Sequence, residues 1–327
     1  NLASCLGGVG LFKESLEAAT EAVLIDPNSQ MGLYNKAVAQ LKLGKFGDSL
    51  ETLKKFEVLA GSNPEVSRHI AFCALQTNDL ALAEKTIEPE LQETSPLDLS
   101  AVEVGLEIYS RKLATEKLEK LLKRVEEEFP NDPRAIRVRA NYLQKIGSPE
   151  ALPLYELALE KSKSESEIFL SEIDIADCLY EAKEYQKSAE IYEKYTDFKH
   201  SNIANDRYAV SLFESGQYGR LLKWVETLEK QVRGNYMIRQ SEAYANWTLN
   251  NLEQAAKIFK ELYEKDPNSI GYLVYYGMCQ FRLGNEQEAK RSYDAIKNKV
   301  TSTSDLAALA GGYEFIGERN LTIELTY

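Results

Sequence analysis

Small residues recur along this chain at intervals of 33 to 36 residues, and this spacing constrains the fold more than any other feature. These residues are Ala3, Ala37, Ala71, Gly105, Ala140, Ala176, Ala209, Ala243, Gly277 and Gly311. A period of this length across a whole chain is typical of one supersecondary unit copied end to end, each copy burying its apolar face against its neighbours. The spacing therefore predicts a repeat architecture and disfavours an enzyme.

A turn is expected seven residues after each small residue, where glycine or a polar residue stands. The expected turn positions are Gly10, Gly44, Asn78, Lys112, Gly147, Lys183, Gly216, Asn250 and Gly284. A second helix follows: apolar residues in 252–265, for example, have the three-and-four spacing of a helix buried on one side. Prolines such as Pro27 and Pro267 stand near the ends of second helices, because proline cannot continue a helix. Each unit is thus predicted to be helix, tight turn, helix and short loop.

The order of a small residue, Gly-x-aromatic-x-x-Ala, an aromatic or aliphatic residue four positions later, and Asp-Pro-Asn resembles the tetratricopeptide repeat. Two clear copies are Ala37 with Gly44, Phe46, Ser49 and Leu53, and Ala243 with Asn250, Leu252, Ala255, Phe259 and Pro267. The resemblance extends over essentially the whole chain, with departures at residues 112–123 and 147–149. It implies an all-α, right-handed solenoid of about nine to ten repeats whose first helices line a concave face. We expect one continuous array over residues 1–327, truncated within a repeat at both ends.

The net charge of −12 argues against nucleic acid or an anionic membrane as the main ligand, because both favour a cationic surface. The chain has no apolar stretch of the roughly 20 residues that a membrane-spanning helix needs, so no membrane insertion is expected. Each of the four cysteines lies two residues after a small residue, and we expect all of them to be reduced, buried packing residues. They are Cys5, Cys73, Cys178 and Cys279. Free thiols favour a reducing compartment, so a cytoplasmic location is expected.

No set of residues in the sequence points to catalysis. The two histidines, His69 and His200, are far apart and have no metal-binding or catalytic partners nearby in the sequence. The glycine-rich run at residues 7–10 lacks the Lys-Ser/Thr of a phosphate-binding loop. We therefore expect no enzyme activity, no catalytic residues, no metal and no cofactor.

Large apolar residues on the first helices of the C-terminal half form the leading candidate site. They are Tyr180, Phe213, Tyr244, Trp247, Tyr275, Met278 and Phe281. Such side chains either fill the space between helices or form an exposed patch for a partner. We expect a protein-interaction scaffold that holds a partner peptide or helix in the concave groove. The alternatives are a non-catalytic arm of a larger enzyme or of a secretion or polysaccharide-export machine, binding carbohydrate or a neighbouring domain, and self-association through the repeat ends.

A second candidate group is polar. Arg134, Arg137 and Asn141 share a helix face, and Arg207 lies two repeats further on; these residues are candidate contacts for an acidic motif. The placement of Arg137 and Asn141 resembles that of Lys and Asn residues in tetratricopeptide co-chaperones that hold a carboxylate. Asp174 stands at the next such position and would repel an acidic ligand. The competing interpretation is an internal ion pair from Arg207 to Asp174 or Asp177.

Overall fold

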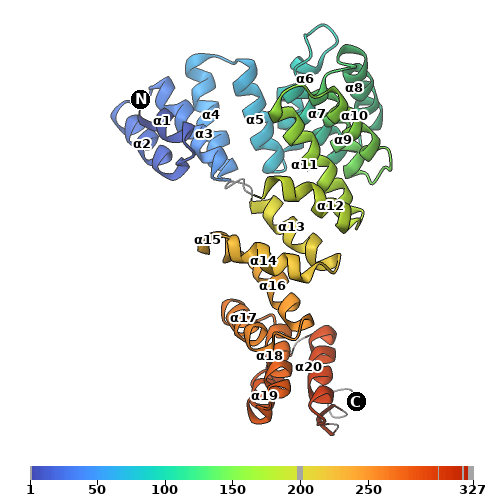
Figure 1. The fold of residues 1–327 in the computed structure, drawn as a ribbon. Coiled ribbons are helices and arrows are strands. Elements are labelled where there is room, and N and C mark those ends of the chain that lie inside the picture. The colour runs from blue at the N-terminus through green and yellow to red at the C-terminus, as the bar shows by residue number, and fades with distance from the viewer. Residues whose placement is uncertain (1, 197–201, 301, 319, 323–327) are drawn as a thin grey trace. The chain divides into compact units, whose positions relative to one another are not determined.

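Every regular element of the chain is helical in a computed structural model that describes residues 2–196, 202–300, 302–318 and 320–322 (Figure 1). The chain divides into two compact units, Asn1–Ser171 and Glu172–Tyr327. Within each unit, most consecutive helices pack against each other in sequence order, and α14 packs against α16 past the short α15. First helices also contact the first helices of the next repeat, as α5 does with α7 and α18 with α20. The predicted all-α solenoid is confirmed.

The first unit contains α1 (Leu2–Gly8), α2 (Phe12–Ile25), α3 (Gln30–Lys42), α4 (Phe46–Ala60), α5 (Pro64–Gln76), α6 (Leu80–Leu91), α7 (Leu99–Arg111), α8 (Thr115–Glu128), α9 (Pro133–Lys145) and α10 (Ala151–Lys161). Helix α11 (Glu165–Glu181) contains the boundary between the units. The second unit continues with α12 (Tyr185–Tyr192), α13 (Asn202–Glu214), α14 (Tyr218–Thr227), α15 (Lys230–Arg233), α16 (Tyr236–Thr248), α17 (Leu252–Lys265), α18 (Gly271–Arg282), α19 (Glu286–Asp294) and α20 (Thr303–Phe315).

Many first helices begin at a side-chain cap. Asn63 accepts a hydrogen bond from the Val66 amide at 3.0 Å, and Asp98 and Asp132 cap α7 and α9 in the same manner. Such caps satisfy amides that have no partner within the helix, which fixes where each first helix starts.

The turns between paired helices use left-handed backbone conformations, as the sequence predicts. Positive φ angles occur at Gly10, Gly44, Asn78, Gly147, Lys183, Gly216, Asn250 and Gly284. The prediction is wrong at Lys112, which caps α7 in a right-handed conformation, while Leu113 takes the positive φ of 55°. The turn residue of this repeat therefore comes eight residues after Gly105 instead of seven, although α7 has the same 13 residues as α5 and α9.

The small residues of the first helices lie where their second helices approach. Ser49 Oγ donates to the Ala37 carbonyl at 2.8 Å, and Ser188 Oγ donates to the Ala176 carbonyl at 2.9 Å. Gly311 is an exception, because a Cβ there would meet nothing within 4 Å. Its neighbours Ala310 and Gly312 are buried instead. The turn of this last repeat comes at Gly317, 33 residues after Gly284, so the packing face is shifted.

The two cores differ in composition. Aliphatic side chains such as Ile87, Ile108 and Leu121 dominate the core of α5–α9. Tyrosine and phenylalanine fill much of the second unit, where Phe259 and Tyr293 are fully buried. The second unit therefore has aromatic side chains both in its core and on the adjoining first-helix surface.

All four cysteines are free, but the expectation that all are buried is wrong. Cys73 and Cys279 are buried, Cys178 is half-buried and Cys5 is exposed. Cys5 belongs to the first helix of the described array, so fewer helices surround it. Among the described helices, none is both long enough and apolar enough to cross a membrane.

Candidate functional site

Six aromatic side chains of the second unit form a continuous chain of ring contacts, here called the aromatic row. Its members, in order of contact, are Phe213, Tyr244, Tyr275, Trp247, Phe315 and Phe281. The ring centroids of successive members lie 6.0, 4.9, 5.8, 6.2 and 6.0 Å apart. These separations are typical of interacting aromatic pairs. The structure thus brings together five of the seven residues predicted for the apolar site.

The row is drawn from the first helices α13, α16, α18 and α20 (Figure 1). Trp247 and Phe281 each lie four residues after a buried small residue, so repeat geometry places them on equivalent parts of neighbouring helices. Phe315 was not predicted. It lies four residues after Gly311, and extending the same position by one repeat would have found it.

The row combines core packing with exposure. Tyr244 and Tyr275 both lie 5.1 Å from the buried ring of Phe259, and burial raises the pKa of Tyr244 to about 12. At the other end, Phe315 is 40% exposed, and Leu283, which caps α18, is 37% exposed. The inner rings therefore support the fold, while the outer end presents apolar surface to solvent.

The other two predicted apolar residues lie outside this chain of rings among the described residues. Met278 is half-buried against the core of α17–α20. Tyr180 packs against Tyr185 at 5.6 Å, and the Arg207 guanidinium lies 5.3 Å from the Tyr180 ring centroid.

A cation that sequence reasoning missed lies on the row. The Arg282 guanidinium is 5.0 Å from the Trp247 ring, and its Nη2 donates to Asn250 Oδ1 at 2.6 Å. A guanidinium over an aromatic face is attracted by the ring electrons. In the sequence, this contact is signalled only by the place of Arg282 at the end of α18, one residue after Phe281.

Arg207, predicted as a candidate contact for an acidic motif, is engaged within the protein. Its guanidinium lies 2.6 Å from Asp177 and 3.4 Å from Glu181. The competing prediction of an ion pair with Asp177 is confirmed.

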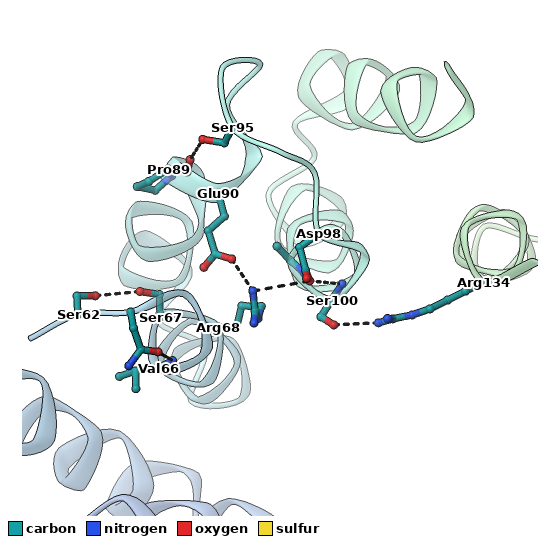
Figure 2. A network of polar contacts seen from close by, with 12 residues as sticks. Ser62, Val66, Ser67, Arg68, Pro89, Glu90, Ser95, Asp98, Ser100 and Arg134 are labelled. Carbon is teal, nitrogen blue, oxygen red and sulfur yellow. Dashed lines mark hydrogen bonds and ion pairs between the residues drawn. The ribbon is translucent and has the colours of Figure 1, made fainter. Parts of the chain in front are cut away.

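The three remaining polar candidates belong to α9 in the first unit. Arg134 Nη2 donates to Ser100 Oγ at 2.9 Å and lies 3.8 Å from Glu103, and Figure 2 shows its reach toward Ser100. Partial burial raises the pKa of Glu103, and the charges of Arg134 and Arg137 oppose that shift. Asn141 Oδ1 lies 2.6 Å from the Tyr155 hydroxyl.

Of these polar candidates, Asn141 lines a small cleft between α7 and α9, with a volume of about 190 Å³. Leu106 and Val138 form its apolar part. Glu103 and Glu107 add two carboxylates, and Lys145 adds one cation, which pairs with Glu107. An acidic ligand would meet these carboxylates, so the local charge does not favour the predicted acidic motif here.

The side chains that could ligate a metal do not gather in the described part of the chain. Among the residues whose positions are described, no group of three or more His, Cys, Asp or Glu side chains could hold a metal ion. His69 is half-buried beside Tyr34, and burial lowers its pKa. His200 lies outside the described residues.

Comparison with known proteins identifies the repeat. Residues 237–269 and 272–300 match the family model for the tetratricopeptide repeat. These segments contain most of α16–α19, and therefore four members of the aromatic row. No curated protein sequence matches the chain.

Solved structures that match this chain include the human IFIT1 dimer with PPP-AAAA, at 17% identity and a TM-score of 0.48, covering 86% of this chain and 67% of that one. YrrB, described as a TPR protein with an unusual peptide-binding site, is 15% identical with a TM-score of 0.46, covering 63% of this chain and 97% of that one. The TPR domain of P58(IPK) is 16% identical with a TM-score of 0.27, covering 97% of both chains. The chain therefore carries tetratricopeptide repeats at residues 237–269 and 272–300, within an array of helix pairs of the same helix–turn–helix kind.

Proposed function

We propose that this chain is a non-enzymatic scaffold that binds another protein by holding a peptide or helix against the aromatic row. The observation that carries the proposal is the continuity of the row across four successive first helices, the last of which carries the exposed ring of Phe315. Broad aromatic surface is the usual anchor of protein recognition, because rigid rings bury large areas at a low cost in conformational entropy.

An apolar segment of a partner fits this surface better than a polyanion does. Leu249 and Leu283, at the ends of α16 and α18, are 44% and 37% exposed. They add aliphatic surface close in sequence to Trp247 and Phe281. The chain carries a net charge of −12, which opposes binding to a phosphate backbone. Carbohydrate remains the second candidate ligand, because sugars stack on the same rings.

The test begins with selection of 12-residue peptides from a random displayed library on the wild-type chain. Affinities of the selected peptides are then measured by fluorescence polarisation. A Trp247→Ala/Phe281→Ala variant should bind them at least about 10-fold more weakly, because truncated anchors at binding sites typically cost more than 1 kcal/mol. The matched control is Phe46→Ala/Phe72→Ala, which removes a contacting aromatic pair, 5.9 Å apart, from the first unit.

Both variants must retain wild-type helicity by circular dichroism. Where Trp247→Ala/Phe281→Ala unfolds, the pair Trp247→Leu/Phe281→Leu preserves apolar volume while removing the rings.

A Trp224→Phe background leaves Trp247 as the single tryptophan, so peptide binding at the row should change the fluorescence of Trp247. Equal peptide affinity in the wild type and the row variants would contradict the proposal.

A further inference from the structure

Arg282 is held in place on the aromatic row by the preceding repeat. Its guanidinium lies 5.0 Å from the Trp247 ring, and Nη2 donates to Asn250 Oδ1 at 2.6 Å. Asn250 is itself fixed in the turn after α16, with a φ of 63°. A side chain held by stacking and by a hydrogen bond loses less conformational entropy when it binds a ligand.

No carboxylate of the described residues pairs with this guanidinium. The cations at the equivalent position in the first unit, two residues before the turn residue, are Lys42, Arg111 and Lys145. Arg111 and Lys145 both pair with Glu107, whereas Lys42 has no carboxylate partner among the described residues. Arg282 has no such partner within the described part of the chain, although the whole protein carries a net charge of −12. A guanidinium has five N–H donors, and the bond to Asn250 uses one of them.

A second arginine of the same unit also stacks on an aromatic ring, and it has a carboxylate partner. Arg207 lies 5.3 Å from the Tyr180 ring, and its guanidinium is 2.6 Å from the Asp177 carboxylate. The two sites share an arginine over an aromatic ring and differ in the carboxylate, which is present at Arg207 and lacking at Arg282.

We propose that the ligand of the aromatic row carries a carboxylate that Arg282 binds, next to the apolar segment that contacts the rings. The inference rests on the proposed function and specifies the chemistry of the partner. A planar guanidinium binds a carboxylate through two parallel hydrogen bonds, so Arg282 selects acidic peptides over neutral ones. The carboxylate comes from an Asp or Glu side chain or from a peptide C-terminus.

The test is a double-mutant cycle on a peptide selected as above and labelled with fluorescein. In successive versions each Asp or Glu is changed to Asn or Gln, and in one version the C-terminus is amidated. One of these changes should weaken binding to the wild type by roughly 10-fold, as expected for a hydrogen bond between charged groups. The same change should have little effect on Arg282→Gln, because that variant has already lost the interaction.

Arg291→Gln is the matched control. Arg291 lies on α19, is exposed and forms no ion pair within the described residues, so its loss changes the net charge of the second unit equally. It should retain wild-type affinity and acid selectivity. Arg282→Lys keeps the charge without the planar fork and should fall between the wild type and Arg282→Gln.

The possible outcomes separate the inference from the proposed function. If the change that weakens binding is a side-chain change, the ligand carboxylate is internal; if it is amidation, the carboxylate is terminal, and either result supports the inference. If no change weakens wild-type binding while Trp247→Ala/Phe281→Ala still abolishes it, the inference is wrong and the scaffold proposal stands. If Arg291→Gln loses acid selectivity as fully as Arg282→Gln does, general charge explains the effect and the inference is wrong. If row variants bind every peptide as the wild type does, both are wrong.

Discussion

The first-helix surface of α7 and α9 and that of α16–α20 share the same repeat but use their cations differently. In the first unit, Arg111 and Lys145 share Glu107, and Arg134 contacts Ser100 and lies near Glu103. In the second unit, Arg282 rests on an aromatic ring without a carboxylate partner among the described residues. Charges paired inside the protein contribute little to recognition, so a repeat surface can recognise an acid only through cations that remain unpaired.

Removal of the buried Glu242 carboxylate should lower the free energy of unfolding more than the glycine substitutions do. The loss from removing a buried carboxylate should differ between the two units. Glu242 is 2% exposed and lies 2.7 Å from Arg233 and 2.5 Å from Arg239. Glu242→Ala should lower the free energy of unfolding by about 3 kcal/mol, because it removes the buried carboxylate that Arg233 and the largely buried Arg239 share. Arg239 keeps its pair with Glu261, whereas Arg233 keeps no paired carboxylate among the described residues. Urea denaturation followed by circular dichroism measures the loss.

The matched substitution in the first unit is Glu90→Ala. One Glu90 oxygen pairs with Arg68, at 2.8 Å, and the other is buried without a hydrogen-bond partner among the described residues (Figure 2). Arg68 also lies 3.7 Å from Asp98, so it keeps a carboxylate when Glu90 is removed. The expected loss is about 1 kcal/mol. Equal losses of unfolding free energy for Glu242→Ala and Glu90→Ala would contradict the expected difference between the two buried ion pairs.

Alanine substitution of the two glycines that pack against second helices should lower stability by amounts that differ less. A Cβ at Gly277 would lie 2.4 Å from a ring carbon of the fully buried Tyr293, whereas a Cβ at Gly105 would lie 2.4 Å from a terminal methyl of half-buried Leu91. Gly277→Ala should cost about 2 kcal/mol, because a confined ring cannot move aside, and Gly105→Ala about 1 kcal/mol.

Gly311→Ala is the control for these glycine variants, because it adds a methyl group in open space. It should raise the free energy of unfolding by roughly 0.5 kcal/mol, since alanine favours a helix more than glycine does. Thermal and urea unfolding of the three variants give the comparison. A loss for Gly105→Ala that matches or exceeds that for Gly277→Ala would contradict the packing argument.

A weaker effect should appear in the pH dependence of stability. Burial raises the pKa of Glu90, although Arg68 opposes the shift, so the folded state binds this proton more tightly than the unfolded state. The resulting stability is present below the unfolded-state pKa and is lost as the pH rises through the folded-state pKa. The stability of Glu90→Gln relative to the wild type should therefore increase between about pH 4 and about pH 7. A flat or falling difference in urea unfolding would contradict this sign.

The last prediction concerns the rates at which the four thiols react, and labelling the wild-type chain requires no substitution. Cys5 should react first with a maleimide and Cys178 next, since one is exposed and the other half-buried. Burial raises the pKa of Cys73, and raises that of Cys279 to about 12, so both thiols should react only when their units open. In Gly277→Ala, Cys279 should react faster while Cys73 keeps its wild-type rate. Mass spectrometry of labelled peptides gives the four rates, and parallel acceleration of both buried thiols would contradict independent opening.

Sequence reasoning found the fold and much of the aromatic row because both follow from helical periodicity. The turns at Gly44 and Asn250 were predictable, since a left-handed residue must end a first helix wherever its partner helix folds back. The shifts at Leu113 and near Gly311 were missed, because small residues stand at the expected spacing there even though the turn comes one residue later or earlier. Phe315 could have been found by extending the row, whereas Arg282 could not, because no sequence pattern shows which ring a guanidinium covers.

The sequence by itself determined the helical repeat, its turns and which helix faces carry aromatic side chains, because these depend on short-range spacing along the chain. Only the tertiary structure decided which charges are paired. Arg207 pairs with Asp177, thirty residues earlier in the preceding repeat, while Arg282 contacts Asn250 and the Trp247 ring there and pairs with no described carboxylate. Pairing depends on distances of a few ångströms between residues far apart in sequence, and the repeat period does not specify these distances.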